Sequence, residues 1–92
     1  MKWYGVIVRS GWEKSFIKKF VKYIEVYDLN DLVGRIESRK VYENYVFIEM
    51  ELCNEVIKVI REVGGNFGFV RFDNEIKELS EKDVKLILSL NE

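Results

Sequence analysis

The side chains of this chain that could do chemistry are lysine, arginine, carboxylate and aromatic groups, because it contains no histidine and one cysteine, Cys53. A single thiol forms no internal disulfide, and without histidine it does not assemble an ordinary zinc site. The same composition excludes the Ser-His and Cys-His pairs that most often activate a nucleophile. Chemistry by lysine or carboxylate alone remains formally open. We therefore predict no metal and no cofactor.

A basic stripe is the first candidate for binding. Lys14, Lys18 and Lys22 recur at i, i+4 and i+8 and so share one face of a helix, with Arg9 and Lys19 near them. These cations would contact nucleic-acid phosphates, each contact adding salt-dependent affinity. The alternative is an ordinary solvated helix face, which the sequence by itself favours. The first 46 residues carry nine Lys and Arg against six Asp and Glu, and the last 46 carry six against ten. This charge asymmetry is too small to decide between nucleic-acid binding and a solvated surface.

An aromatic sheet face is the second candidate. Successive strand side chains point to opposite sides, so Trp3 shares a face with Ile7, and Tyr45 shares a face with Phe47. A monomer rarely exposes a large contiguous apolar patch, and aromatic residues are enriched where proteins dock. Two helices on one face of a four-stranded sheet leave the opposite face free. We therefore predict that a partner docks on this face, and the alternative is that a helix covers it.

Two other motifs suggest competing functions. Residues 67–72 match the end of the RNA-recognition-motif signature, whose aromatic residues stack on bases. A single-stranded RNA-binding module would use Phe67, Phe69 and Arg71, but the signature would then occupy the wrong strand. A third hypothesis is an acylphosphatase-like enzyme, which needs a phosphate-cradling loop beside an arginine. The turn after Arg9 is a poor version of such a loop.

Length and composition indicate one folded domain spanning residues 1–92. The chain is 48% hydrophobic and 14% aromatic, more than a disordered chain carries. Ninety-two residues suffice for one modest core without a roomy catalytic cleft. No run approaches the roughly 20 apolar residues that cross a bilayer, and no targeting segment is recognisable. We expect a cytoplasmic monomer without membrane contact.

The elements that must position these side chains alternate between sheet and helix. We predict strands over residues 2–9, 32–36, 44–50 and 66–72. We predict helices that begin after N-caps at Ser10, Asn54 and Ser80, with Ser10/Glu13 and Ser80/Asp83 as capping boxes. Gly64-Gly65 ends the second helix and Asp73-Asn74 forms a turn. The resulting order is β-α-β-β-α-β-α, a ferredoxin-like α+β sandwich with a four-stranded antiparallel sheet.

The motifs together resemble the NusG N-terminal (NGN) domain family. Residues 2–4 and 10–13 are similar to its K-W-Y…S-G-(Y/F)-E opening, and residues 30–36 to its D-L-(F/V)-G-x-(I/V) segment. Residues 44–50 resemble the family's (G/N)-Y-(V/L)-(L/F)-(V/I)-E-M strand. Residues 69–72, followed by Leu79-Ser80, resemble its G-F-V…L-S-x-x-E-V close. The four segments occur in the family's order across nearly the whole chain.

This chain departs from the family pattern at two places, which affects how closely the family's structure applies to it. The family's F-P-G-Y is Tyr42-Glu43-Asn44-Tyr45 here, with asparagine at the glycine position as in RfaH-type paralogues. The β-hairpin that bacterial members insert between the second and third strands is replaced by residues 37–41, which resembles the compact archaeal and eukaryotic version. A KOW domain usually follows in the family, so we expect an isolated domain of a longer protein.

The resemblance implies a transcription elongation and antitermination factor, not an enzyme, associated with the nucleoid through RNA polymerase. Such a domain docks on the clamp coiled coil of the largest polymerase subunit, bridges the cleft to the opposite lobe and modulates pausing and termination. By position, the resemblance assigns polymerase binding to Trp3, Gly5, Ile7, Tyr42, Tyr45 and Phe47, with Lys58 near the opposite lobe. The resemblance also assigns contact with non-template or upstream DNA to Arg9, Lys19 and Lys22. These residues accompany Lys14 and Lys18 of the basic stripe.

Overall fold

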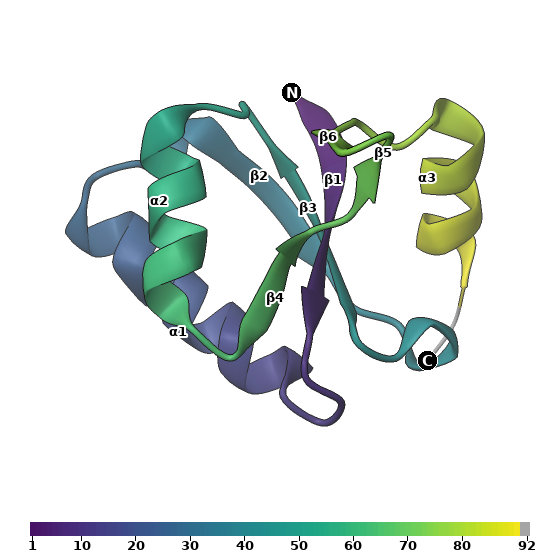
Figure 1. Ribbon diagram of the computed structural model, residues 1–92, viewed down its shortest axis with the longest axis horizontal. Coiled ribbons are helices and arrows are strands. Elements are labelled where there is room, and N and C mark those ends of the chain that lie inside the picture. The colour runs from purple at the N-terminus through teal and green to yellow at the C-terminus, as the bar shows by residue number, and fades with distance from the viewer. Residues whose placement is uncertain (91–92) are drawn as a thin grey trace.

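A single four-stranded antiparallel sheet organises the molecule. The computed structural model describes residues 1–90 (Figure 1). The strands are β1 (Lys2–Val8), β2 (Val33–Glu37), β3 (Tyr45–Met50) and β4 (Asn66–Phe69), and the helices are α1 (Glu13–Val26), α2 (Asn54–Val63) and α3 (Glu81–Ser89). Short 3₁₀ turns, η1 (Asn30–Leu32) and η2 (Lys40–Tyr42), precede β2 and β3. The sheet order β2-β3-β1-β4 is the ferredoxin-like arrangement, so the predicted fold class is confirmed.

The main core lies between the sheet and the helix pair α1 and α2. Alternation in β1 sends Tyr4, Val6 and Val8 to this side, and alternation in β3 sends Val46, Ile48 and Met50 there. The α1 residues Phe16, Phe20 and Ile24 meet them, together with Val56, Val59, Ile60 and Val63 of α2. Both the strand period of two and the helix period of 3.6 predict this face correctly.

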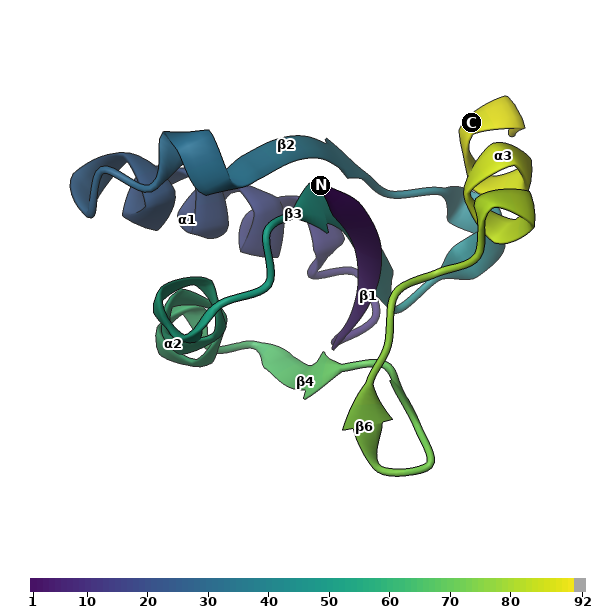
Figure 2. The same cartoon turned by 90° about the horizontal axis from the view of Figure 1, so that it is seen from above.

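The opposite face of the sheet has a smaller apolar cluster and a helix of its own. Figure 2 shows α3 on the other side of the sheet from α1 and α2. Trp3, Phe47 and Ile87 are buried there, packed with half-buried Leu79 and Val84. The prediction that this face stays bare is therefore wrong in part, because α3 folds back on it.

The fourth predicted strand is shorter than expected. Gly68 adopts φ +90°, β4 ends at Phe69, and the Val70 N–H donates to the Gly5 carbonyl at 2.8 Å. The chain then forms a separate hairpin of β5 (Arg71–Phe72) and β6 (Glu75–Ile76). The predicted turn at Asp73-Asn74 is confirmed, and both residues have positive φ, as tight hairpin turns require.

Of the three predicted N-caps, one is correct. Ser80 caps α3, its Oγ accepting a hydrogen bond from the Asp83 N–H at 3.1 Å. Helix α1 instead begins after Trp12 and α2 after Cys53, neither with a side-chain cap. The Ser10–Glu13 capping box fails because Gly11, at φ +83°, turns the chain first.

The Glu13 carboxylate bonds to a distant segment instead. It accepts a hydrogen bond from the Asn44 N–H at 3.0 Å, joining the start of α1 to the start of β3. That N–H, together with N–H groups at the start of α1, lowers the pKa of Glu13. Asn44 was expected within the third strand, but it adopts φ +73° and lies before it.

Within residues 1–90, no helix is long and apolar enough to cross a bilayer. The same residues bring together no group of three or more His, Cys, Asp or Glu side chains that would hold a metal ion.

Candidate protein-docking groove

An apolar groove of about 270 Å³ lies between β3 and α3. Its lining comes from β3, the η2 turn before it, the β4–β5 junction and the α3 region. The lining residues are Tyr42, Tyr45, Phe47, Val70, Leu79, Asp83, Leu86 and Ile87.

The floor of the groove is a group of three aromatic rings. The Phe47 ring stacks on Tyr45, with centroids 6.2 Å apart and an interplanar angle of 13°. Tyr42 meets Phe47 edge-on, at 5.8 Å and 84°. Phe47 is only 6% exposed, whereas both tyrosines are half-buried. The tyrosines therefore offer a partner aromatic surface that Phe47 holds in place.

Helix α3 forms the wall. Leu79 and Val84, which lie just before and four residues after the Ser80 cap, both pack on the sheet cluster in the arrangement of a hydrophobic staple. The Leu79 N–H also donates to the Trp3 carbonyl at 2.7 Å. Ile87 is buried, but Leu86 is 52% exposed at the edge of the groove. A side chain of that size left in water beside an apolar groove is typical of a protein contact surface.

The structure brings together three of the seven residues predicted to bind the polymerase. Tyr42, Tyr45 and Phe47 line the groove. Trp3 is 9% exposed beneath α3, and Ile7 is half-buried outside the groove, opposite Tyr45 in the β1–β3 register. Trp3 therefore supports the groove from below instead of presenting a surface of its own.

Gly5 contributes by having no side chain. A Cβ on Gly5 would lie 3.0 Å from Val70 Cγ2, so the glycine makes room for Val70 in the groove lining. Sequence reasoning did not assign the other five lining residues to the site: Val70, Leu79, Asp83, Leu86 and Ile87. The sequence did contain one indication that the last helix packs here, namely Leu79 directly before the Ser80 cap. A hydrophobic residue in that position often packs against the helix that follows.

Lys58 lies in a different part of the molecule. It is exposed on α2 and lines a separate cavity of about 220 Å³ with Tyr27 and Glu62. The Tyr27 hydroxyl donates to the Glu62 carboxylate at 2.8 Å, which raises the pKa of Tyr27. Lys58 is therefore not part of the groove, and its predicted contact with the opposite lobe stays a prediction.

The predicted nucleic-acid residues form an exposed basic stripe along α1. Lys14, Lys18, Lys19 and Lys22 are all exposed, and so is Arg9 at the end of β1. The stripe belongs to the helix layer, whereas the groove belongs to the α3 side of the sheet (Figure 2). The two predicted contact surfaces are thus on different sides of the molecule.

An exposed aromatic residue accompanies this stripe. The Arg9 guanidinium lies 5.5 Å from the centroid of the Trp12 ring, within the range of a cation–π contact. Trp12 is 44% exposed, and a side chain on Gly65 would lie 3.0 Å from it.

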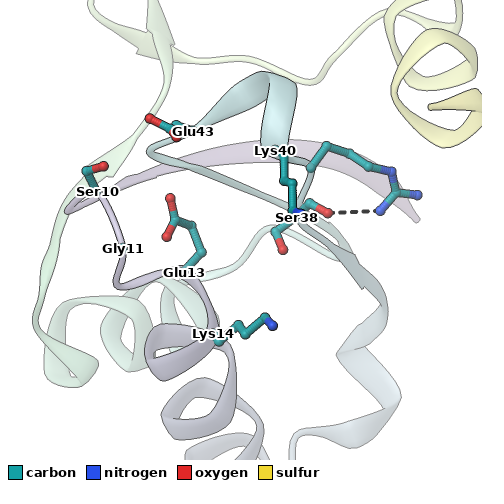
Figure 3. Close-up of a pocket in the computed structure, with 8 residues that line it drawn as sticks. Ser10, Gly11, Glu13, Lys14, Ser38, Lys40 and Glu43 are labelled. Atoms are coloured by element: carbon teal, nitrogen blue, oxygen red, sulfur yellow. Dashed lines mark hydrogen bonds between the residues drawn. The ribbon is translucent and has the colours of Figure 1, made fainter. Parts of the chain in front are cut away.

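A cavity of about 340 Å³, larger than the groove, lies between the start of α1 and the link from β2 to β3 (Figure 3). Lys14, Arg39 and Lys40 supply three cations to its lining, and Glu13 and Glu43 supply two carboxylates. Its charges are already engaged in part, because Arg39 pairs with Glu37 at 2.7 Å and Glu13 accepts from Asn44. Figure 3 shows the Glu13 side chain between the Ser10–Gly11 turn and the segment that carries Lys40 and Glu43. We therefore assign the candidate site to the groove and not to this cavity.

The residues of the RNA-binding alternative are not brought together on one surface. Phe69 is 7% exposed and packs edge-on against Tyr4 in the main core, with ring centroids 6.4 Å apart. Phe67 is 69% exposed on β4, and Arg71 belongs to the β5–β6 hairpin. Base stacking on sheet aromatics needs at least two exposed rings side by side, and Phe69 does not supply one.

The sheet order and the groove define a class: a ferredoxin-like α+β domain with an apolar, aromatic-floored groove between the sheet and its last helix. Residues 1–88 match the NusG family, described as transcription termination factor nusG, and the chain belongs to that family.

Individual relatives agree with this assignment. The transcription termination/antitermination protein NusG of Halalkalibacterium halodurans is 29% identical over 85 residues, covering 74% of this chain and 48% of that protein. The structure of Thermotoga maritima NusG matches with a TM-score of 0.79 and 28% identity, covering 97% of this chain and 56% of that one. The chain thus spans about half the length of these relatives.

Two archaeal structures share the fold. The N-terminal domain of NusG (NGN) from Methanocaldococcus jannaschii matches with a TM-score of 0.69 and 19% identity, covering 92% of this chain and 98% of that one. A chain of an Spt4 heterodimer complex from Methanococcus jannaschii matches with a TM-score of 0.77 and 19% identity, covering 98% of this chain and 99% of that one.

Proposed function

We propose that this domain binds the clamp coiled coil of the largest RNA polymerase subunit through the groove between β3 and α3. The observation that carries the proposal is the coincidence of two independent indications. The family resemblance assigns polymerase contact to Tyr42, Tyr45 and Phe47, and these three residues form the floor of the groove. A helix with apolar side chains on its outer face can lay that face in an apolar groove with exposed aromatic edges.

Bridging the cleft explains how binding alone would change transcription. A ligand shifts a two-state equilibrium only as far as its affinities for the two states differ. A domain that contacts the clamp through the groove and the opposite lobe through the α2 surface near Lys58 makes both contacts only when the clamp is closed. It therefore stabilises the closed clamp and modulates pausing and termination without performing a reaction.

The basic stripe would contact nucleic acid in this arrangement. Arg9, Lys19 and Lys22, with Lys14 and Lys18, are exposed and do not line the groove. Helix α1, which carries the lysines, lies on the other side of the sheet from α3 (Figure 2). Non-template or upstream DNA supplies phosphates for them.

Binding of the domain to a recombinant clamp coiled-coil fragment tests the proposal. Tyr45→Ala and Leu86→Ala should each weaken binding by roughly tenfold or more, because contacts at the centre of an interface carry most of its energy. Phe47 is a poor choice for this test, because it is only 6% exposed and its truncation would cost about 3–5 kcal/mol of stability.

Tyr27→Ala is the matched control. Tyr27 is likewise a tyrosine with an accessible ring, 51% exposed, but it lies on the helix layer away from the groove. Its replacement should leave the dissociation constant within about twofold of the wild type. Undiminished binding by both groove variants would refute the proposal.

A further inference from the structure

The groove has one charged side chain in an otherwise uncharged lining. Seven of the eight lining residues are tyrosine, phenylalanine or aliphatic, and the eighth is Asp83. A charge in this position discriminates between partners, because a wrong or missing counter-charge leaves it poorly solvated once the groove is filled.

Asp83 is held in place by the start of α3 while its carboxylate stays available. Its backbone N–H donates to Ser80 Oγ at 3.1 Å, which fixes the residue in the first turn of the helix. Within residues 1–90 its carboxylate takes part in no ion pair or side-chain hydrogen bond. The residue is exposed, so a partner reaches it without rearranging the domain.

We propose that Asp83 determines the specificity of the groove by pairing with an arginine or lysine of the docked polypeptide. This inference rests on the proposed function. The ligand it describes is a helix that places an apolar side chain on the aromatic floor and a cation three or four residues away, on the same helix face. Arginine suits the position best, because its planar guanidinium pairs with a carboxylate and also stacks on an aromatic ring such as that of Tyr45.

The neighbouring carboxylates do not share this role. Glu81 also lies in the first turn of α3 and is exposed, but it does not line the groove. Glu43 lines the cavity on the other side of η2. A nucleic acid is a poor occupant of the groove, since its phosphates would face Asp83 and find no cation in the lining.

The test compares Asp83→Asn with Glu81→Gln. Each variant removes one carboxylate from the first turn of α3, so both lose a similar favourable interaction with the helix dipole. Circular dichroism and thermal melting should therefore show similar small changes. The two variants differ in whether the missing charge lay in the groove.

Binding to the clamp coiled-coil fragment is measured by calorimetry at low and moderate salt. Asp83→Asn should weaken binding roughly tenfold and reduce its dependence on salt, whereas Glu81→Gln should stay within about twofold of the wild type. Asp83→Lys should weaken binding further than Asp83→Asn. Changing the arginines and lysines of the fragment to glutamate one at a time should identify one position at which Asp83→Lys restores affinity.

The possible results separate the role of Asp83 from the proposed function of the groove. Equal binding by Asp83→Asn and Glu81→Gln, with wild-type binding intact, overturns the role of Asp83 and leaves the proposed function standing. Failure to restore affinity at any position of the fragment also overturns the pairing. No binding by the wild-type domain overturns the proposed function, and this inference with it.

Discussion

Single residues decide how β3 is joined to the rest of the molecule. Asn44 adopts φ +73°, a conformation that asparagine tolerates better than most residues, which fits the glycine-or-asparagine position of the family pattern that residues 44–50 resemble. Its N–H donates to the Glu13 carboxylate, so one hydrogen bond fixes the turn that leads into the groove floor. Gly5 acts in the same region by leaving space for Val70. None of these residues lines the groove, yet each lies next to a segment that does.

Glu13→Gln should make stability less dependent on pH. The folded pKa of Glu13 lies below its ordinary value of 4.5, so the fold favours the ionised form. That contribution is complete above the ordinary pKa and is lost as pH falls through the lowered folded value. We expect the variant to lose about 1 kcal/mol of unfolding free energy near pH 7 and to approach the wild type near pH 3. Urea denaturation at several pH values measures this.

Glu25→Gln is the control for that experiment. It lies on the same helix, and within residues 1–90 its exposed carboxylate accepts no hydrogen bond from another side chain or from the backbone. A Glu13→Gln difference that is the same at pH 7 and pH 3 would contradict the role of the Asn44 contact.

At the scale of elements, α3 stands apart from the rest. The core between the sheet and α1 and α2 is separate from the cluster beneath α3, in which Ile87 is the one buried helix residue among those described. Burying a side chain of this size contributes about 2 kcal/mol. Helix α3 should therefore open locally at a lower free energy than the whole domain.

Ile87→Ala should loosen α3 selectively. Loss of the buried side chain should lower the free energy of α3 opening by about 2 kcal/mol or more. Amide hydrogen exchange measured by NMR should then speed up in residues 81–89 and change little in α1 and α2. Leu86→Ala is the control on the same helix, because Leu86 is 52% exposed. Equal acceleration in α1, α2 and α3 would show that α3 does not open on its own.

At the scale of the whole molecule, the sheet separates the two proposed contact surfaces. The groove lies on the α3 side and the basic stripe on the α1 side, so both can be occupied together (Figure 2). The net charge of −1 hides this division, because the cations of α1 are offset by carboxylates elsewhere. A domain with two independent surfaces is suited to hold two parts of one assembly together.

Replacing Lys14, Lys18 and Lys22 by glutamine should affect one surface and not the other. Binding to a single-stranded DNA oligonucleotide should weaken, and the slope of log K against log salt should fall in magnitude by up to about 2, because each lost phosphate contact removes about 0.7. Fluorescence anisotropy at several salt concentrations measures this. Binding to the clamp coiled-coil fragment should stay unchanged. An unaltered DNA affinity would contradict this prediction and would indicate that the stripe is an ordinary solvated helix face.

The sequence by itself determined the features that depend on local periodicity. The alternation in residues 2–8 and 45–50, the apolar stripe of α1 and the Ser80 cap each require only neighbours along the chain, and each is correct. The same alternation correctly placed Tyr45 and Phe47 on the face away from the main core.

Only the tertiary structure decided what happens on that face. The burial of Trp3 by Ile87 joins residues at opposite ends of the chain, and no local pattern specifies that contact. The end of β4 after Phe69 depends on the contact between Gly5 and Val70. The Glu13 carboxylate accepts a hydrogen bond from the distant Asn44 N–H, which no local pattern indicates. Such long-range contacts set which aromatic residues stay accessible, and so they determine the groove and its single charge.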